Sequence, residues 1–170
     1  TSCFSLVKEQ ISQADLAIGN LEVTLAGKPY KGYPTFRDPA ESLQSIKDAG
    51  FALLIPANNH CLDRGKKGLE RTLFMLDSLQ IPHAGTYRNS SERKQQYPLF
   101  IHKKGFRLAF LSYTYGTNGI KTTAPNIVNY IDRNKILQDI RSAQARRPDA
   151  IIAYMHWGEE YHSLPNREQR

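Results

Sequence analysis

The hydrophobic positions of the chain fall into short apolar runs separated by segments with helical spacing. Residues 51–56 and 151–155 have the length and apolar character of buried strands, and residues 15–22 contain a shorter run of the same kind. Residues 97–102 and 106–113 are expected to pair as a hairpin. The pattern therefore predicts an α/β chain in which strands and helices alternate and a hairpin follows.

Three segments place apolar residues on one helical face. These are residues 38–49, 68–79 and 132–145, and each is bounded by residues that start or stop helices. Residues 26–36 and 115–121 are rich in Gly with Pro or Asn, and we expect irregular loops there.

Polar side chains follow the apolar run 51–56 at the junction with the next helix. Asn58, Asn59, His60 and Asp63 stand in this short turn. Loops at the carboxyl ends of strands open into the crevice where α/β proteins place their chemistry. These side chains could bind a metal or an oxyanion and transfer a proton. The alternative interpretation is an Asn-rich turn, with Asn58 or Asn59 left-handed and Asp63 capping the next helix.

Two other predicted strands also end in polar chemistry. Residues 15–22 carry Asn20 and Glu22, whose alternation places both side chains on one face if the strand continues that far. The run 151–155 is followed by a group of candidate residues, His156, Trp157, Glu160 and His162. Three strand ends that carry Asn, Glu or His predict one shared site.

The composition is that of one compact domain or most of one. Of 170 residues, 40% are apolar, and nine Tyr and seven Phe can fill a core. Cys3 and Cys61 form neither a zinc-type pair nor a redox motif. We expect Cys61 to be a small buried side chain, and a disulfide between the two stays open as an alternative.

The formal net charge of +7 raises the question of an acidic partner. Lys and Arg gather loosely between Arg88 and Arg107, but they follow no nucleic-acid motif. Residues 103–105, Lys-Lys-Gly, are more simply the turn of the hairpin. No nucleic-acid partner is expected, and the charge suits an acidic polymer instead.

Several segments together resemble the CapA family of bacterial capsule and poly-γ-glutamate synthesis proteins. The resemblance rests on residues 14–22, 57–65 and 156–161. Shorter matches lie between them in the same order, at residues 81–85, 108–113, 117–119 and 128–132. The likeness covers nearly the whole chain, so we interpret residues 1–170 as a single CapA-like domain.

The resemblance implies an α/β fold similar to the calcineurin-like metallophosphoesterases, a β-sandwich flanked by helices with two metals at the strand ends. By position, Asn59 is expected to act in catalysis as a metal ligand, and His156 is expected to bind metal. His60 is expected to donate a proton or stabilise the transition state. Asn20 stands where phosphoesterases have a bridging Asp, so either Glu22 takes over this role or the second metal is weak or absent.

The implied reaction is metal-assisted hydrolysis of a phosphoester or related bond. Nitrogen and oxygen ligands do not decide between manganese, iron and zinc as the divalent ion. Substrate contacts are expected from the remaining polar residues of the three strand ends and one loop, namely Asn58, Asp63, Asn118, Trp157, Glu160 and His162.

The family pattern also starts before Thr1 and continues beyond Arg170, so we expect a domain that is incomplete at both ends. The resemblance implies a protein of the cell envelope or the exterior, anchored through an upstream segment. Expected partners are capsule synthesis membrane proteins and an acidic capsule polymer or phosphoester. The alternative function is a non-catalytic polymer-binding or assembly component, which the amide at Asn20 favours.

Overall fold

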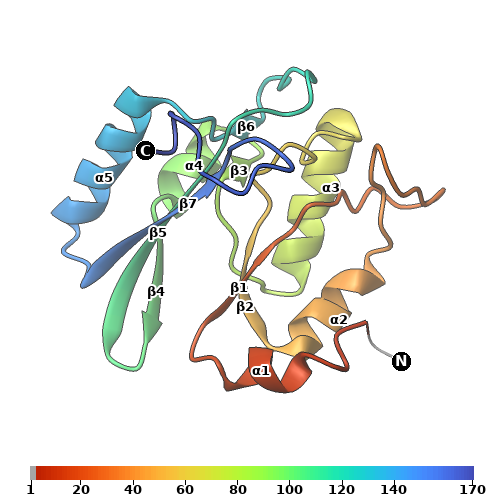
Figure 1. The fold of residues 1–170 in the computed structure, drawn as a ribbon, viewed down its shortest axis with the longest axis horizontal. Helices are drawn as coiled ribbons and strands as arrows, with labels where there is room; N and C mark the ends of the chain where they lie inside the picture. Colours follow the sequence, from red (N-terminus) through yellow and green to blue (C-terminus); the bar gives the residue numbers. More distant parts are fainter. Residues whose placement is uncertain (1–2) are drawn as a thin grey trace.

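The computed structural model describes residues 3–170, which form a mixed α/β fold (Figure 1). The predicted α/β class is confirmed. None of the helices in the described part is both long and apolar enough to cross a membrane. The helices are α1 (Lys8–Gln13), α2 (Glu41–Ala49), α3 (Gly65–Ser78), α4 (Ser90–Gln96) and α5 (Arg133–Ala145).

Residues 3–170 form three sheets, and two of these carry the strands that were predicted from the sequence. In the first, β1 (Ala17–Asn20) runs parallel to β2 (Phe51–Ile55), and Asn20 is the register partner of Ile55. In the second, β5 (Phe106–Thr114) lies between β4 (Leu99–Lys103) and β7 (Ala150–His156). The pair β4 and β5 is antiparallel, whereas β5 and β7 are parallel. Because β1 and β2 run parallel, as do β5 and β7, the polar residues at the carboxyl ends of each pair lie at the same edge of the sheet.

The third sheet was not predicted, and neither was the helix beside it. It consists of β3 (Thr86–Tyr87) and β6 (Ile127–Val128), which are too short to show a period of hydrophobic residues. The unpredicted helix α4 is polar, but it begins with a recognisable cap, because Asn89 Oδ1 accepts a hydrogen bond from Glu92 N. An Asn followed three residues later by Glu is a start signal that hydrophobic periodicity alone misses.

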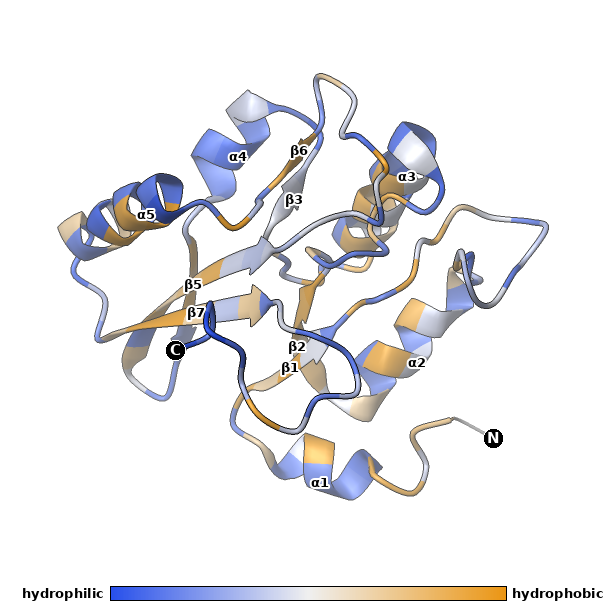
Figure 2. Cartoon of the chain, turned by 45° about the horizontal axis from the view of Figure 1, so that its top comes forward, coloured by the Kyte–Doolittle hydropathy of each residue, from blue (hydrophilic) through white to orange (hydrophobic). Residues whose placement is uncertain are grey.

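The core forms where the sheets face each other and the helices. Phe110, Leu111 and Tyr113 of β5 are buried together with Leu53 and Ile55 of β2. Figure 2 shows hydrophobic residues along β2, β5 and β7, while the helices carry hydrophobic and hydrophilic residues in alternation. Packing on both sides of β2 fixes its carboxyl end, so the residues that follow β2 also have a fixed position.

The hairpin turn, the two cysteines and the starts of two helices were also predicted. The hairpin turn is confirmed, with φ of 46° at Lys104 and 84° at Gly105, as a two-residue turn of this type requires. Cys61 is buried, Cys3 is exposed, and both are free thiols, so the open alternative of a disulfide is wrong. Helix α2 begins at Glu41, two residues after Pro39, and α3 begins at Gly65 rather than at residue 68.

Candidate functional site

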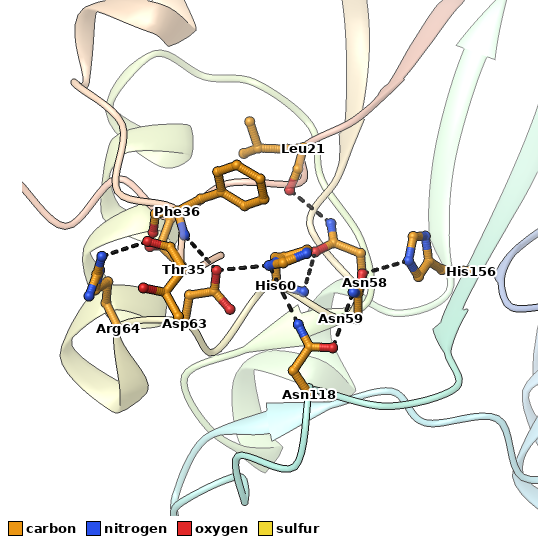
Figure 3. Close-up of polar contacts among 11 residues, drawn as sticks. Leu21, Thr35, Phe36, Asn58, Asn59, His60, Asp63, Arg64, Asn118 and His156 are labelled. Carbon is orange, nitrogen blue, oxygen red and sulfur yellow. Dashed lines mark hydrogen bonds and ion pairs between the residues drawn. The ribbon is translucent and has the colours of Figure 1, made fainter. Parts of the chain in front are cut away.

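The structure brings the three predicted strand ends together (Figure 3). Asn58, which follows β2, donates from Nδ2 to Asn20 Oδ1 at the end of β1, over 3.1 Å. Its neighbour Asn59 has Oδ1 2.8 Å from Nε2 of His156, the last residue of β7. Asn59 Nδ2 also donates to Asn118 Oδ1 over 3.2 Å. A single cluster therefore joins β1, β2, β7 and the loop after β5.

The β2–α3 turn, residues 56–63, is buried at every position. Asn58 is 0% exposed, donates to Leu21 O over 2.8 Å and accepts from His60 N over 3.1 Å. These bonds use its side chain to hold the turn to the end of β1. This placement does not fit the substrate contact predicted for Asn58, because its amide faces the protein interior.

Asp63 lies beside the imidazole of His60. Its Oδ2 is 2.8 Å from His60 Nδ1 and accepts from Phe36 N over 2.7 Å. Because a carboxylate only accepts, Nδ1 carries a proton and Nε2 is the nitrogen left for chemistry. The Phe36 ring packs edge-on against His60, with centroids 4.7 Å apart. The predicted substrate contact does not fit Asp63 either, since its side chain is 1% exposed.

The simple Asn-rich turn, which was the alternative interpretation, is wrong. The described residues with positive φ include neither Asn58 nor Asn59. The residue preceding α3 is Arg64, and no side chain caps that end of the helix. Asp63 therefore acts on His60 and not on the helix.

Glu22 reaches the cluster by a route that differs from the predicted strand alternation. Strand β1 ends at Asn20, so the condition for that alternation, a strand that continues to Glu22, is not met. The two side chains nevertheless meet, because Asn20 Nδ2 donates to Glu22 Oε2 over 2.6 Å. Asn20 thus holds the carboxylate of Glu22 in place while its own oxygen accepts from Asn58.

A cavity of about 490 Å³ opens next to these residues. Glu22, Asn59 and His156 line one side of it, and the other side is formed by the β7 tail, residues 157–165. The predicted residues Trp157, Glu160 and His162 all line this cavity. Tyr115, which sequence reasoning missed, lies parallel to the His156 ring with centroids 6.0 Å apart. Its position directly after β5 was the available signal.

Burial and two neighbouring side chains shift the pKa of His156 in different directions. Loss of water contact lowers the pKa of His156 below its usual value, the Glu22 carboxylate raises it, and His60 lowers it again. Burial dominates, so the neutral imidazole is favoured. A neutral imidazole is the form that binds metal ions.

The donor atoms of the cluster differ from a site built only of charged ligands. Within residues 3–170, no group of three or more His, Cys, Asp or Glu side chains is placed to hold a metal. The candidate donors are instead the amides of Asn20 and Asn59, the imidazole of His156 and the carboxylate of Glu22. Asn59 Oδ1 and His156 Nε2 lie 2.8 Å apart, the distance of a hydrogen bond in which Nε2–H donates to the amide oxygen. Amide oxygen, carboxylate oxygen and imidazole nitrogen are donors that manganese, iron and zinc accept, so the chemistry of the set fits a divalent ion once that proton is released.

A solved structure and two curated proteins resemble this chain. The 5'-nucleotidase precursor from Thermus thermophilus aligns with a TM-score of 0.50 and 15% identity, over 80% of this chain and 26% of its own. That likeness confirms the expected metallophosphoesterase-like fold. The PGA biosynthesis protein CapA of Bacillus subtilis (strain 168) is 29% identical over 99% of this chain. The capsule biosynthesis protein CapA of Bacillus anthracis is 25% identical over 98%.

The chain spans less than half the length of these curated relatives, 46% of the first and 43% of the second. The family match, in contrast, extends over residues 1–170, and the family is described as bacterial capsule synthesis protein PGA_cap. Together with the fold and the cluster at the strand ends, this match shows that the chain belongs to the PGA_cap family of bacterial capsule synthesis proteins.

Proposed function

We propose that this site hydrolyses a phosphoester or a related bond during synthesis of a capsule or poly-γ-glutamate polymer. The observation that supports the proposal most is that the fold brings an amide oxygen and an imidazole nitrogen, Asn59 Oδ1 and His156 Nε2, together at the strand ends, beside a histidine that is held by a buried carboxylate. Metal donors next to an acid–base group are the arrangement that metal-assisted hydrolysis needs.

Four side chains are proposed to hold metal. Asn59 and His156 supply an adjacent oxygen and nitrogen, and Glu22 and Asn20 extend the donor set on the side of β1. A bound manganese, iron or zinc ion would lower the pKa of a coordinated water. Glu22, the one carboxylate among the four, takes the place of the missing aspartate.

His60 is proposed as the acid that protonates the leaving oxygen. When the imidazole is protonated, Nε2 gives up the proton while Asp63 holds Nδ1 and stabilises the positive charge. Asn118 Oδ1 accepts a hydrogen bond from Asn59 Nδ2, so Asn118 positions Asn59. Substrate contacts are proposed for Trp157, Glu160 and His162, because they line the cavity opposite the metal-binding pair.

The test measures metal content and hydrolysis of bis(4-nitrophenyl) phosphate on the whole natural polypeptide that carries this sequence. His60→Ala should retain bound metal and lose at least about 100-fold in rate, because general acid catalysis contributes that much. His156→Ala should lose metal and rate together. A wild-type protein that is inactive with manganese, iron and zinc alike would overturn the hydrolase proposal.

A non-catalytic binding or assembly role is the second candidate, and Asn20 favours it. An amide bridges two metals less well than a carboxylate, and both ends of this amide are already bonded to Asn58 and Glu22. A binder should retain affinity for poly-γ-glutamate in EDTA and in His60→Ala. An enzyme should lose turnover under both conditions.

The proposed setting is the cell envelope or its exterior, together with membrane proteins of capsule synthesis. The formal charge of +7 suits contact with an acidic polymer through long-range attraction. Binding of poly-γ-glutamate that weakens as salt increases would support this partner. Binding that ignores salt would argue against it.

A further inference from the structure

A second cavity lies between α4 and α5, with β6 as its floor. Its volume is also about 490 Å³, and none of its lining residues lines the cavity of the candidate site. Figure 2 shows α4 and α5 next to each other on the side of the molecule that carries β6. The proposed function gives this cavity no role.

The inner wall of the cavity is a buried polar network with balanced charge. Arg93 Nη2 lies 2.7 Å from Asp139 Oδ2, and the Tyr113 hydroxyl donates to the same oxygen over 2.9 Å. Arg93 Nε donates to Asn129 Oδ1 over 2.8 Å. These bonds occupy the carboxylate and neutralise it, so the wall is held rigidly and adds no net charge to the cavity.

Two lysines on the facing helices remain uncompensated. Lys94 of α4 and Lys135 of α5 both line the cavity. Across residues 3–170, neither ammonium group takes part in an ion pair. The lining also includes two apolar residues of β6, Val128, which is buried, and Ile127, which is half-buried. The cavity therefore combines two free positive charges at its edge with a hydrophobic surface inside.

We propose that this cavity binds an organic anion with an apolar body. The acidic group lies between Lys94 and Lys135, and the body covers Ile127 and Val128. A volume of about 490 Å³ is within the range of small-molecule sites. Carboxylates and phosphates share the chemistry that two ammonium groups recognise. The inference does not depend on the proposed hydrolysis.

The test uses 2-naphthoate and its neutral counterpart 2-naphthamide, with binding followed by calorimetry and by amide chemical shifts. The naphthoate should bind saturably and shift the amides of α4, β6 and α5, whereas the naphthamide should bind at least tenfold more weakly. The double variant Lys94→Gln, Lys135→Gln should lose at least tenfold in affinity for naphthoate. Lys8→Gln, Lys67→Gln is the matched control, because it removes the same charge from exposed positions on α1 and α3.

A second variant blocks the space without changing the charge. Ser142 lines the cavity and is exposed, so Ser142→Phe should fill the cavity and abolish naphthoate binding, while Ser142→Ala should leave it intact. His60→Ala should also bind naphthoate like the wild type. The proposal is overturned if the wild type shows no saturable binding, if naphthamide binds equally well, or if the control pair loses as much affinity as Lys94→Gln, Lys135→Gln.

Discussion

The two sides of the candidate site differ in how they are held. The β2–α3 turn is buried at every position from residue 56 to residue 63, whereas residues 158–165 of the β7 tail are all exposed. The turn is tied by side-chain bonds to β1 and to the loop before α2. The tail carries Glu160 and His162 on a segment without regular structure. The comparison indicates that the turn side of the site is held by buried side-chain bonds, whereas the tail side is an exposed segment that should open more easily.

Glycine substitutions should give the largest difference between the two sides. Gly85 and Gly158 have similar φ, 109° and 104°, so alanine is strained at both. At Gly85 a Cβ would lie 2.4 Å from Ala57 Cβ in the turn, and Ala57 cannot rotate away. At Gly158 it would meet the flexible end of Gln169 at 2.7 Å. We expect Gly85→Ala to reduce the free energy of unfolding by about 3–4 kcal/mol and Gly158→Ala by about 1 kcal/mol.

Urea unfolding measures both values on the same scale. Equal losses for the two variants would mean that the residues around the turn accommodate a methyl group as easily as the tail does. That result would contradict the inferred difference between the two sides of the site.

Removing a buried amide should have the next largest effect. Asn58→Ala breaks the bonds to Leu21 O and Asn20 and leaves groups unpaired in the interior. We expect a loss of about 2 kcal/mol in the free energy of unfolding. Glu160→Gln in the tail should change it by less than about 0.5 kcal/mol. Thermal unfolding of the three proteins checks this, and an unchanged midpoint for Asn58→Ala would contradict the structural role of that side chain.

The two cysteines allow the turn to be probed by its chemistry. Burial raises the pKa of the Cys61 thiol to about 12, so at pH 8 almost none of it is thiolate. Cys3 is exposed. With Ellman's reagent at pH 8, we expect one rapidly reacting thiol in the folded protein and two after unfolding. In Cys3→Ser, rapid labelling of Cys61 without denaturant would show that the turn opens readily.

The smallest effect that we predict is separate unfolding of the β7 tail at a low urea concentration. Trp157 is the only tryptophan of the chain, and it is the first residue of the tail. Because local opening of exposed segments needs little free energy, its fluorescence should change at a lower urea concentration than the circular dichroism at 222 nm. Coincident transitions would place the tail in the same cooperative unit as the turn.

The sequence predicted the parts of the fold in which local pattern and burial agree. The apolar run of β2 and the polar residues after it were recognised because a buried strand leaves a continuous hydrophobic signal. The strand ends of β1 and β7 were found in the same way. The polar helix α4 and the two-residue strands β3 and β6 carry no such signal, since tertiary contacts hold them.

Within the site, residue type did not reveal orientation. Asn58 and Asn59 are neighbours of the same kind, but one faces the interior and the other lies beside His156. Asp63 could be assigned to His60 only once the turn had been seen to bring them within 2.8 Å. The approach of Tyr115 to His156 depends on the pairing of β5 with β7, which no local pattern encodes.

The amide of Asn20 also determines the charge at this end of β1. It donates to the Glu22 carboxylate at 2.6 Å and accepts from Asn58 at the same time, which a carboxylate cannot do. An aspartate at this position would set two negative charges against each other unless a proton or a cation lay between them. Asn20→Asp is therefore expected to keep its contact with Glu22 only while a proton or a cation lies between the two side chains.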